Sequence, residues 1–373
     1  MSRRFLLAAL VVLVSVLVAG CGGGSSESSG ETDKSSGAKQ KVTLQLKWVT
    51  QAQFAGYYAA KAKGYYDEEG LDVNIKIGGP SITPEQVVLG KQAEFGIDWL
   101  PSLLAARDTG QNLVNIAQVF GKSGMTELTW KDSNITSIAQ MKGKKVGVWC
   151  CGNENELYAA LNKNGMDPKK DVTIVNQPFD MNLFLNRQVD AAAAMTYNEL
   201  AQVLETKNPK TGKLYQPSDI NVIKMDDAGT GMLEDGVFVR GDWIADKDNQ
   251  ETAKKFLAAS FKGWIYCRDH VDECTQIVLD NGPTLGKGHQ TWMMNEINAL
   301  AWPSKNGIGV MDKADYEQTA EIAKQFGVIS KAPSADAYRT DLAQDAVDEI
   351  SAEADVNGND YKKPAVKVTP KGA

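Results

Sequence analysis

The chain has 373 residues, of which 43% are hydrophobic, and a formal net charge of −7 at neutral pH. This length and composition are sufficient for two lobes with apolar cores. An acidic chain lacks the basic face that nucleic-acid binding requires, so nucleic acid is excluded as a partner.

Residues 1–20 have the pattern of an export signal: Arg3 and Arg4 precede an apolar run that is too short to span a bilayer. The small residues before Cys21 resemble a bacterial lipobox, so we expect cleavage before Cys21 and a lipid on its thiol. Loss of the two arginines takes the net charge from −7 to −9. The polar, glycine-rich and serine-rich segment 21–40 is expected to be a flexible tether. Together these features predict a protein anchored to the outer face of the cell membrane.

From residue 41, strand-like runs alternate with helix-like segments, which favours an α/β body with largely parallel sheet. The expected strands are 42–46, 71–77, 94–97, 113–120, 127–130, 146–149, 172–175, 189–193 and 237–239. The expected helices are 54–69, 83–90, 101–107, 153–164, 182–186, 198–205, 251–266, 289–301, 314–326 and 334–352.

The chain has two successive runs of alternating strands and helices, then a strand that returns to the first lobe, and then a helical C-terminal part. This order favours a two-lobed clamshell with two crossing strands. We expect lobe 1 to comprise residues 41–140 and 232–355 and lobe 2 to comprise residues 141–231. Residues 356–373 contain two prolines and are expected to form a mobile tail.

Four cysteines remain after lipidation. Cys267 and Cys274 flank a short helix-to-turn segment, and we expect a structural disulfide between them because exported proteins keep such bonds. Cys150 and Cys151 are adjacent, so we expect reduced thiols packed near a ligand. The two histidines show no zinc-binding spacing, and the chain has neither a G-x-S-x-G elbow nor a Walker loop. We therefore expect no metal, no cofactor and no catalytic residues.

Several candidate ligand-binding residues follow strands of the first lobe, where open α/β sheets bind their ligands. Trp48 follows the first strand and can stack on a flat ring, with a core position as the alternative. Asp98 and Trp99 follow the third strand, and for Asp98 a helix N-cap is an equal alternative. Tyr57 and Tyr58 lie in a helix, so at most one of them faces the cleft.

The second lobe contributes a strand-to-helix turn that contains Cys150, Asn153 and Glu154. Backbone N–H groups at a helix start favour negative or polar ligand atoms. Glu199 can accept a hydrogen bond from a ligand amine, with an exposed helix position as the alternative.

The run 47–66, Lys-Trp-Val-Thr-Gln-Ala-Gln-Phe-Ala-Gly-Tyr-Tyr-Ala-Ala-Lys-Ala-Lys-Gly-Tyr-Tyr, resembles the substrate-binding proteins related to thiamine-pyrimidine uptake and synthesis. That group sits beside the nitrate, sulfonate and taurine binders. The resemblance extends over about residues 42–260, through Gly-Ile-Asp-Trp at 96–99, Val-Gly-Val-Trp at 146–149, Arg-Gln-Val-Asp-Ala-Ala at 187–192 and Tyr-Asn-Glu at 197–199.

The resemblance implies a periplasmic-binding-protein fold of the second type, with a ligand closed between two lobes. It also implies that Trp48 and Tyr197 stack on a pyrimidine ring whose amino group meets Glu199. The first motif carries Thr50, Gln51 and Gln53 where the family often has Pro, Asn and His, which places Gln53 among the ligand contacts and implies that the ligand can differ.

The expected function is therefore that of a monomeric solute-binding lipoprotein that delivers a small heteroaromatic molecule to an ABC permease. A flavin or a sulfonate-type or nitrate-type anion is the alternative ligand, although few cations fall on the cleft motifs. A pyrimidine synthase or exported hydrolase is the rival enzymatic reading, and a sensory ectodomain is a third.

Overall fold

The computed structural model describes residues 38–373. The expected signal segment, Cys21 and nearly all of the expected tether lie outside the described residues. The first strand begins at Gln40, within the expected tether 21–40, so the folded body starts slightly earlier than residue 41. No helix of this described part combines the length and the apolar composition that a membrane span requires.

The described residues contain short strands separated by helices, in the alternating order that the sequence predicts. The strands are β1 (Gln40–Gln45), β2 (Leu71–Lys76), β3 (Phe95–Asp98), β4 (Leu113–Gln118), β5 (Met125–Trp130), β6 (Lys145–Val148), β7 (Thr173–Asn176), β8 (Ala191–Met195), β9 (Ile220–Lys224) and β10 (Gly236–Arg240).

Helices connect these strands and form the C-terminal part. They are η1 (Ala52–Phe54), α1 (Ala55–Ala62), α2 (Tyr65–Glu68), α3 (Pro84–Leu89), α4 (Leu100–Asp108), α5 (Asn155–Lys163), α6 (Asn182–Leu185), α7 (Glu199–Leu204), α8 (Met225–Ala228), α9 (Gly241–Ile244), α10 (Lys247–Asp269), α11 (Val271–Asn281), α12 (Lys287–Ala301), α13 (Lys313–Gln325) and α14 (Asp341–Ile350). Single 3₁₀ turns occur elsewhere, including η6 (Pro370–Gly372) at the C-terminus.

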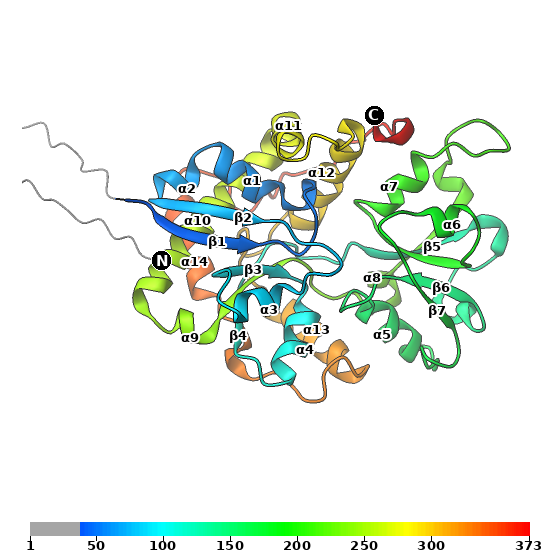
Figure 1. The fold of residues 1–373 in the computed structure, drawn as a ribbon, viewed down its shortest axis with the longest axis horizontal. Coiled ribbons are helices and arrows are strands. Elements are labelled where there is room, and N and C mark those ends of the chain that lie inside the picture. Colours follow the sequence, from blue (N-terminus) through cyan, green and yellow to red (C-terminus); the bar gives the residue numbers. More distant parts are fainter. Residues whose placement is uncertain (1–37) are drawn as a thin grey trace, which may run out of the picture. The chain divides into compact units, whose positions relative to one another are not determined.

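The strands form two five-stranded sheets with the same plan (Figure 1). The first sheet has the order β2-β1-β3-β10-β4, and the second has the order β7-β6-β8-β5-β9. In each sheet three neighbouring strands run parallel, and the fourth strand, β10 or β5, is antiparallel to both of its neighbours. The chain passes between the sheets at 119–124 and again at 225–235. The predicted two-lobed α/β fold with two crossings is confirmed.

The lobe boundary differs from the expected one. β5 pairs with β8 and β9, so the second lobe begins at Met125 and not at residue 141. Every residue of β4 and of β5 is buried, as in strands covered on both faces. The sequence predicts a strand near β5, but it does not indicate which sheet this strand joins.

Local chemistry explains where several helices end. The expected helix 54–69 is divided into η1, α1 and α2, and the break falls at Gly64, whose φ of 80° is a left-handed conformation that suits glycine. α3 begins with Thr83 as its N-cap and Pro84 as its first residue, as predicted. α14 covers only part of the expected helix 334–352, while α11 and β9 were not predicted.

The core of the first lobe is a stack of aromatic rings between the sheet and the long helix α10. Phe256 of α10 lies 4.0 Å from Phe95 of β3 and 5.5 Å from Tyr66, measured between ring centroids. In the second lobe Trp130 stacks on Phe184 at 4.5 Å. Each lobe therefore has its own aromatic contacts, while one cluster of buried apolar side chains contains residues of both sheets.

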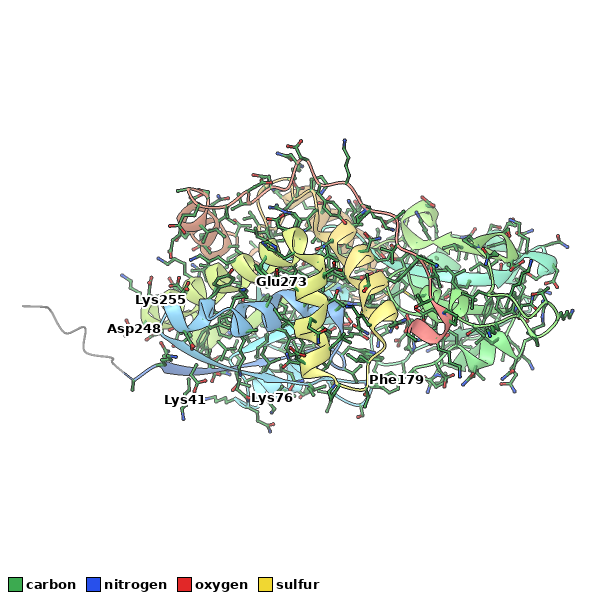
Figure 2. The ribbon with its side chains drawn as sticks, turned by 90° about the horizontal axis from the view of Figure 1, so that it is seen from above. Lys41, Lys76, Phe179, Asp248, Lys255 and Glu273 are labelled. Atoms are coloured by element: carbon green, nitrogen blue, oxygen red, sulfur yellow. A yellow bond between two sulfur atoms is a disulfide. The ribbon has the colours of Figure 1, made fainter. Side chains whose placement is uncertain are left out.

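The tail 356–373, expected to be mobile, is instead placed along α12 and reaches α7 (Figure 2). The Tyr361 hydroxyl donates to the Asn295 carbonyl oxygen at 3.4 Å, and the Lys371 backbone N–H donates to the Glu205 carbonyl oxygen at 3.0 Å. The two tail prolines suggested an unstructured end, but Val356 is buried and Val368 packs on apolar residues of the second lobe.

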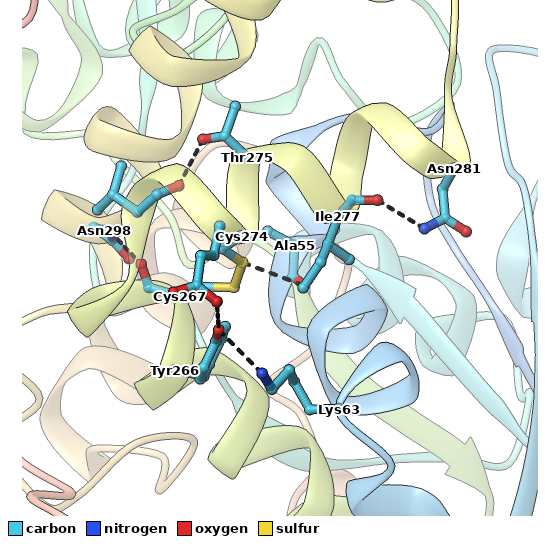
Figure 3. The surroundings of a disulfide bond; sticks show 11 residues. Ala55, Lys63, Tyr266, Cys267, Cys274, Thr275, Ile277, Asn281 and Asn298 are labelled. Atoms are coloured by element: carbon cyan, nitrogen blue, oxygen red, sulfur yellow. Dashed lines mark hydrogen bonds between the residues drawn. A yellow bond between two sulfur atoms is a disulfide. The ribbon is translucent and has the colours of Figure 1, made fainter.

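A disulfide joins Cys267, near the end of α10, to Cys274 of α11 (Figure 3). Both cysteines are fully buried. The Cys274 sulfur lies 3.9 Å from the Ala55 carbonyl oxygen of α1, and the Asn298 side chain of α12 donates to the Cys267 carbonyl oxygen at 3.2 Å. The bond therefore lies where α1, α10, α11 and α12 meet.

Candidate ligand-binding site

A pocket lies between the two lobes, where strands of both sheets end. It encloses about 320 Å³, its open mouth included. Its lining residues follow β1, β3, β6 and β8 at their carboxyl ends or belong to η1 and the start of α7, a common position for ligands of α/β sheets. They are Lys47, Trp48, Gln51, Gln53, Trp99, Trp149, Asn153, Met195, Tyr197, Asn198 and Glu199.

A buried ion pair supports the wall of the first lobe. The Lys47 ammonium group is paired with the Asp98 carboxylate, which also accepts the Trp99 backbone N–H at 2.6 Å. The Lys47 nitrogen lies 4.8 Å from the centre of the Trp99 ring, in a cation–π geometry. Burial alone would lower the pKa of Lys47, but Asp98 and other nearby carboxylates raise it above its ordinary value. This cation is therefore already neutralised within the protein.

A chain of amides extends along the same wall. The Gln51 side chain donates to the Gln53 side-chain oxygen at 2.6 Å, and the Gln53 side chain donates to Asp235 at 2.7 Å. Burial raises the pKa of Asp235 to about 7, against the hydrogen bond from Gln53 and the attraction of Lys47, which both lower it. The chain of donors fixes the orientation of both glutamine amides, so that each presents a defined face to the pocket.

The second lobe contributes Trp149 and Asn153 from the turn after β6. The Trp149 indole N–H donates to the Pro178 carbonyl oxygen at 3.2 Å, and the Asn153 amide donates to the Cys150 carbonyl oxygen at 2.8 Å. Both side chains are thus held by the backbone of their own lobe.

The segment after β8 supplies Tyr197, Asn198 and Glu199. The Glu199 carboxylate accepts the Met195 backbone N–H at 2.9 Å and the Asn198 amide at 2.8 Å. Burial raises the pKa of Glu199 to about 7, although these backbone hydrogen bonds and the nearby His289 lower it. Burial also raises the pKa of Tyr197 well above its ordinary value, so its phenol stays neutral. Glu199 can therefore be present as an acid or as a carboxylate near neutral pH.

One aromatic contact crosses the mouth of the pocket. Trp48 of the first lobe meets Phe179 of the second lobe edge-on, with ring centroids 5.2 Å apart and an angle of 63° between the planes. Phe179 is 46% exposed and is seen at the surface in Figure 2. The two lobes are therefore close enough for their aromatic side chains to touch.

Four of the ten expected ligand-binding residues do not line the pocket. Tyr57 is buried in the core, edge-on to Trp264 at 5.7 Å, and Tyr58 is also buried, with its hydroxyl 3.0 Å from that of Thr50. Helical spacing identified an apolar face, but it did not indicate that this face turns toward α10. Asp98 neither lines the pocket nor caps α4, because Trp99 occupies the N-cap position and Asp98 pairs with Lys47.

The turn after β6 accounts for the other two. Glu154 accepts the Gly152 backbone N–H at 2.9 Å and does not line the pocket. Cys150 is exposed and joined to Cys151 by a disulfide, which corrects the expectation of reduced thiols packed near a ligand. Cys151 has a φ of 70° and Gly152 a φ of 102°, so the chain reverses here and turns the cysteines outward while Trp149 and Asn153 face the pocket.

Five lining residues were not predicted: Lys47, Gln51, Trp149, Met195 and Asn198. Each is within three residues of a predicted one and lies at or after the same strand end, so extending the strand-end rule to neighbouring positions would have found them. No local sequence pattern predicts that Lys47 pairs with Asp98.

The pocket suits a planar molecule with hydrogen-bonding edges. Trp48, Trp99, Trp149 and Tyr197 supply aromatic surfaces, and Gln51, Gln53, Asn153, Asn198 and Glu199 supply donors and acceptors. The Trp99 indole N–H is buried without a hydrogen-bond partner among the described residues. In the part of the chain that the structure covers, no group of three or more His, Cys, Asp or Glu side chains is arranged to hold a metal ion.

Two lobes of this topology around an interlobe pocket define the class as proteins with the periplasmic-binding-protein fold. Within that class, the chain belongs to the family described as NMT1/THI5 like, whose model matches residues 51–274.

Curated relatives named for several roles are similar to this chain. A Haemophilus influenzae protein named for thiamine biosynthesis is 27% identical and covers 82% of this chain and 93% of its own. A riboflavin-binding protein of Chloroflexus aurantiacus is 24% identical, covering 78% and 82%. A 4-amino-5-hydroxymethyl-2-methylpyrimidine phosphate synthase of Saccharomyces cerevisiae is 26% identical, covering 61% and 66%.

Solved structures share the fold. The aliphatic sulphonate-binding protein of Escherichia coli aligns with a TM-score of 0.60 at 14% identity, covering 82% of this chain and 91% of its own. The nitrate-binding protein of Synechocystis aligns with a TM-score of 0.60 at 15% identity, covering 86% and 92%. At these identities the likeness shows the fold alone.

Proposed function

We propose that this protein is an extracytoplasmic solute-binding protein of an ABC importer, and that it holds a small heteroaromatic molecule such as a thiamine pyrimidine precursor in the pocket between its lobes. The observation that carries the proposal is the pocket lining, with four aromatic side chains, several amides and one carboxylic acid. Trp48 and Tyr197 are assigned to the faces of the ring and Glu199 to an amino group at its edge.

The balance of charge favours a neutral ligand with hydrogen-bond donors over an oxyanion. Lys47 is the one cation among the lining residues, and Asp98 already neutralises it. A nitrate or sulfonate would also lie near Glu199, whose charged form repels anions. An aminopyrimidine can instead donate to the Glu199 carboxylate, in a hydrogen bond worth about 1.5–3 kcal/mol.

A flavin is the second candidate, because the same aromatic surfaces suit an isoalloxazine ring and one relative is named for binding riboflavin. Binding without chemical change is proposed for both ligands. Closure on the ligand is then a shift toward the closed state, limited by the difference in affinity between the open and closed forms.

We also propose that the protein acts as a monomer, anchored through a lipid on Cys21, and that its closed form docks on an ABC permease. The chain's own export pattern before Cys21 supports the anchor. Labelling with a radioactive fatty acid in the native host tests it: the wild-type chain takes up label and Cys21→Ala does not. Label on both chains would refute the anchor without affecting the pocket.

The ligand is tested in two stages. Mass spectrometry of small molecules released by denaturing freshly purified protein identifies what the pocket carries. Calorimetric titration of the emptied protein then compares 4-amino-5-hydroxymethyl-2-methylpyrimidine, riboflavin, ethanesulfonate and nitrate. We expect the pyrimidine to bind and the two anions not to bind; tight binding of an anion alone would refute the proposal.

The hydrolase alternative is tested with the same titrant. A hydrolase converts its substrate repeatedly, whereas a binding protein returns one unaltered molecule per chain. We expect the pyrimidine to be recovered unchanged after long incubation, and turnover would overturn the proposal.

A further inference from the structure

The first turns of α12 make contacts with both walls of the pocket. α12 packs against α10, α11 and η1, all of which belong to the first lobe. Its buried residues Met293, Met294 and Ile297 lie on the side that faces the core. The helix is thus part of the first lobe, but its N-terminal end also contacts α7 of the second lobe.

On the first-lobe side, α12 holds the turn that carries the pocket amides. The Gln290 side-chain oxygen accepts the Ala52 backbone N–H at 2.7 Å, and Gln290 is almost completely buried. Ala52 lies directly between Gln51 and Gln53, whose side chains line the pocket. Gln290 therefore fixes the N-terminal end of η1.

On the second-lobe side, the preceding residue, His289, is held between two partners. Its Nδ1 lies 2.9 Å from a Glu205 carboxylate oxygen, and its Nε2 lies 2.9 Å from the Asn198 side-chain oxygen. One turn along, the Trp292 indole N–H donates to the Thr196 carbonyl oxygen at 3.0 Å. Thr196 and Asn198 flank Tyr197, so the pocket residue Tyr197 lies between two positions that are hydrogen-bonded to α12.

The hydrogen bonds define the role of one ring nitrogen, Nε2. The Asn198 amide nitrogen donates to Glu199, so the Asn198 oxygen is the atom that faces His289, and Nε2 must donate to it. Nδ1 lies within hydrogen-bonding distance of the Glu205 carboxylate on the other side of the ring. The result is a continuous chain of hydrogen bonds from Glu205 through His289 and Asn198 to Glu199 in the pocket.

We infer that His289 and Trp292 are positioning residues that latch the Thr196–Glu199 wall to the first lobe, while Gln290 fixes the opposite wall from the same helical turn. Since α12 moves with the first lobe, opening the cleft requires the His289 and Trp292 contacts to break. Closing restores them and places Asn198 and Glu199 for the ligand. The inference deepens the proposed function and depends on it for the identity of the pocket.

Two variants test the latch, with two matched controls. His289→Ala removes the link to Asn198, and Trp292→Phe keeps an aromatic ring but loses the N–H donor. Thr291→Ala is the control on the same helix, because among residues 38–373 the Thr291 hydroxyl bonds only to the Lys287 carbonyl oxygen of its own turn. His270→Ala is the control for loss of a histidine, since His270 lies at the junction of α10 and α11.

Affinity for 4-amino-5-hydroxymethyl-2-methylpyrimidine, measured by calorimetry, is the first measurement. We expect it to weaken about tenfold in His289→Ala, to weaken a few-fold in Trp292→Phe, and to stay within twofold of wild type in both controls. NMR of the imidazole nitrogens adds a signature that a merely structural role would not produce. The chain has two histidines, and we expect the ligand to shift the His289 signals and leave those of His270 in place.

Hydrogen exchange in the ligand-free protein is the second measurement. It needs no ligand, because the closed form, in which the latch contacts are made, is also populated in the absence of ligand. We expect faster exchange over residues 195–205 in His289→Ala and Trp292→Phe, with β1 unchanged. If wild type does not bind the pyrimidine, the ligand assignment fails while exchange still decides the latch. Unchanged exchange, or unchanged affinity in both variants of a protein that binds the pyrimidine, would overturn the inference.

Discussion

The two walls of the pocket differ in how they are held. The first-lobe wall is paired with groups of its own surroundings: Lys47 with Asp98, and Gln53 with Asp235. The second-lobe wall carries Glu199, whose pKa burial raises to about 7, and its amide neighbour Asn198 is bonded to His289 of α12. The cation of the first wall is therefore committed to an ion pair within the protein. Each wall also holds an acid with a pKa of about 7, but Glu199 of the second wall lines the pocket whereas Asp235 of the first wall does not.

Removal of Lys47 gives the largest expected effect and tests this difference directly. Lys47→Met leaves Asp98 buried without its cation, and breaking one partner of a buried ion pair costs about 3–5 kcal/mol. Urea unfolding of the ligand-free protein at neutral pH measures the loss. Lys170→Met is the control, because Lys170 is 81% exposed and pairs with Asp167 at the surface, where a pair contributes about 0–1 kcal/mol. Equal losses of unfolding free energy in Lys47→Met and Lys170→Met would contradict the structural role of the buried Lys47–Asp98 pair.

The second wall is expected to respond to pH. Because the Glu199 pKa is raised from 4.5 to about 7, the folded state keeps a proton that the unfolded state releases. The free energy of unfolding that this group contributes is therefore fully present below about pH 4.5, falls as pH rises through about 7, and is absent above that. A shift of this size corresponds to a change on the order of 3 kcal/mol.

Glu199→Gln isolates that contribution. The variant has no titrating group at this position, so we expect its unfolding free energy to fall less steeply with pH than that of wild type between about pH 4.5 and 7. Asp235 titrates in both proteins with the same sign, since its pKa is also raised to about 7, and it cancels in the comparison. Parallel urea-unfolding profiles in the two proteins would show that Glu199 does not hold the extra proton.

The sequence predicted the pocket best where a rule of topology applies. Side chains that follow parallel strands gather at one edge of a sheet, and this rule predicted Trp48 and Trp99, which line the same pocket although they are far apart in the chain. The family resemblance, and not this rule, predicted Tyr197. The alternation of strands and helices similarly predicted both lobes.

The position of side chains after strand ends does not predict contacts that depend on the packing of particular side chains. Tyr57 lies on a helix whose buried face could be recognised but not assigned to pocket or core, and the structure places it against Trp264. The partner of β5 depends on hydrogen bonds to strands far along the chain, β8 and β9. His289 meets Asn198 only because α12 folds back over the second lobe, and no local pattern near residue 289 indicates this.

Replacement of Trp48 is expected to have an intermediate effect, on ligand affinity, and it tests whether the aromatic side chains of the pocket bind a ring. Trp48→Ala removes the stacking face on the first wall, and we expect the affinity for 4-amino-5-hydroxymethyl-2-methylpyrimidine to fall about tenfold. Phe179→Ala is the control, because Phe179 touches Trp48 at the mouth but does not line the pocket. We expect less than a threefold change there. If calorimetric titration shows a larger loss of affinity in Phe179→Ala than in Trp48→Ala, the ligand binds at the mouth and not inside the pocket.

The smallest effect is expected from the exposed cysteine pair on the second wall. Cys150 and Cys151 are adjacent, so their disulfide closes almost no loop of chain and restricts the unfolded state little. The contact that this turn makes with the pocket passes through the Cys150 carbonyl oxygen, which serine keeps, and Asn153 can still donate to it. We therefore expect the double variant Cys150→Ser with Cys151→Ser to unfold within about 0.5 kcal/mol of wild type and to bind the pyrimidine within about twofold. A loss as large as that of Trp48→Ala would mean that the disulfide itself shapes the second wall, and that this wall is held by the bond between the cysteines as well as by α12.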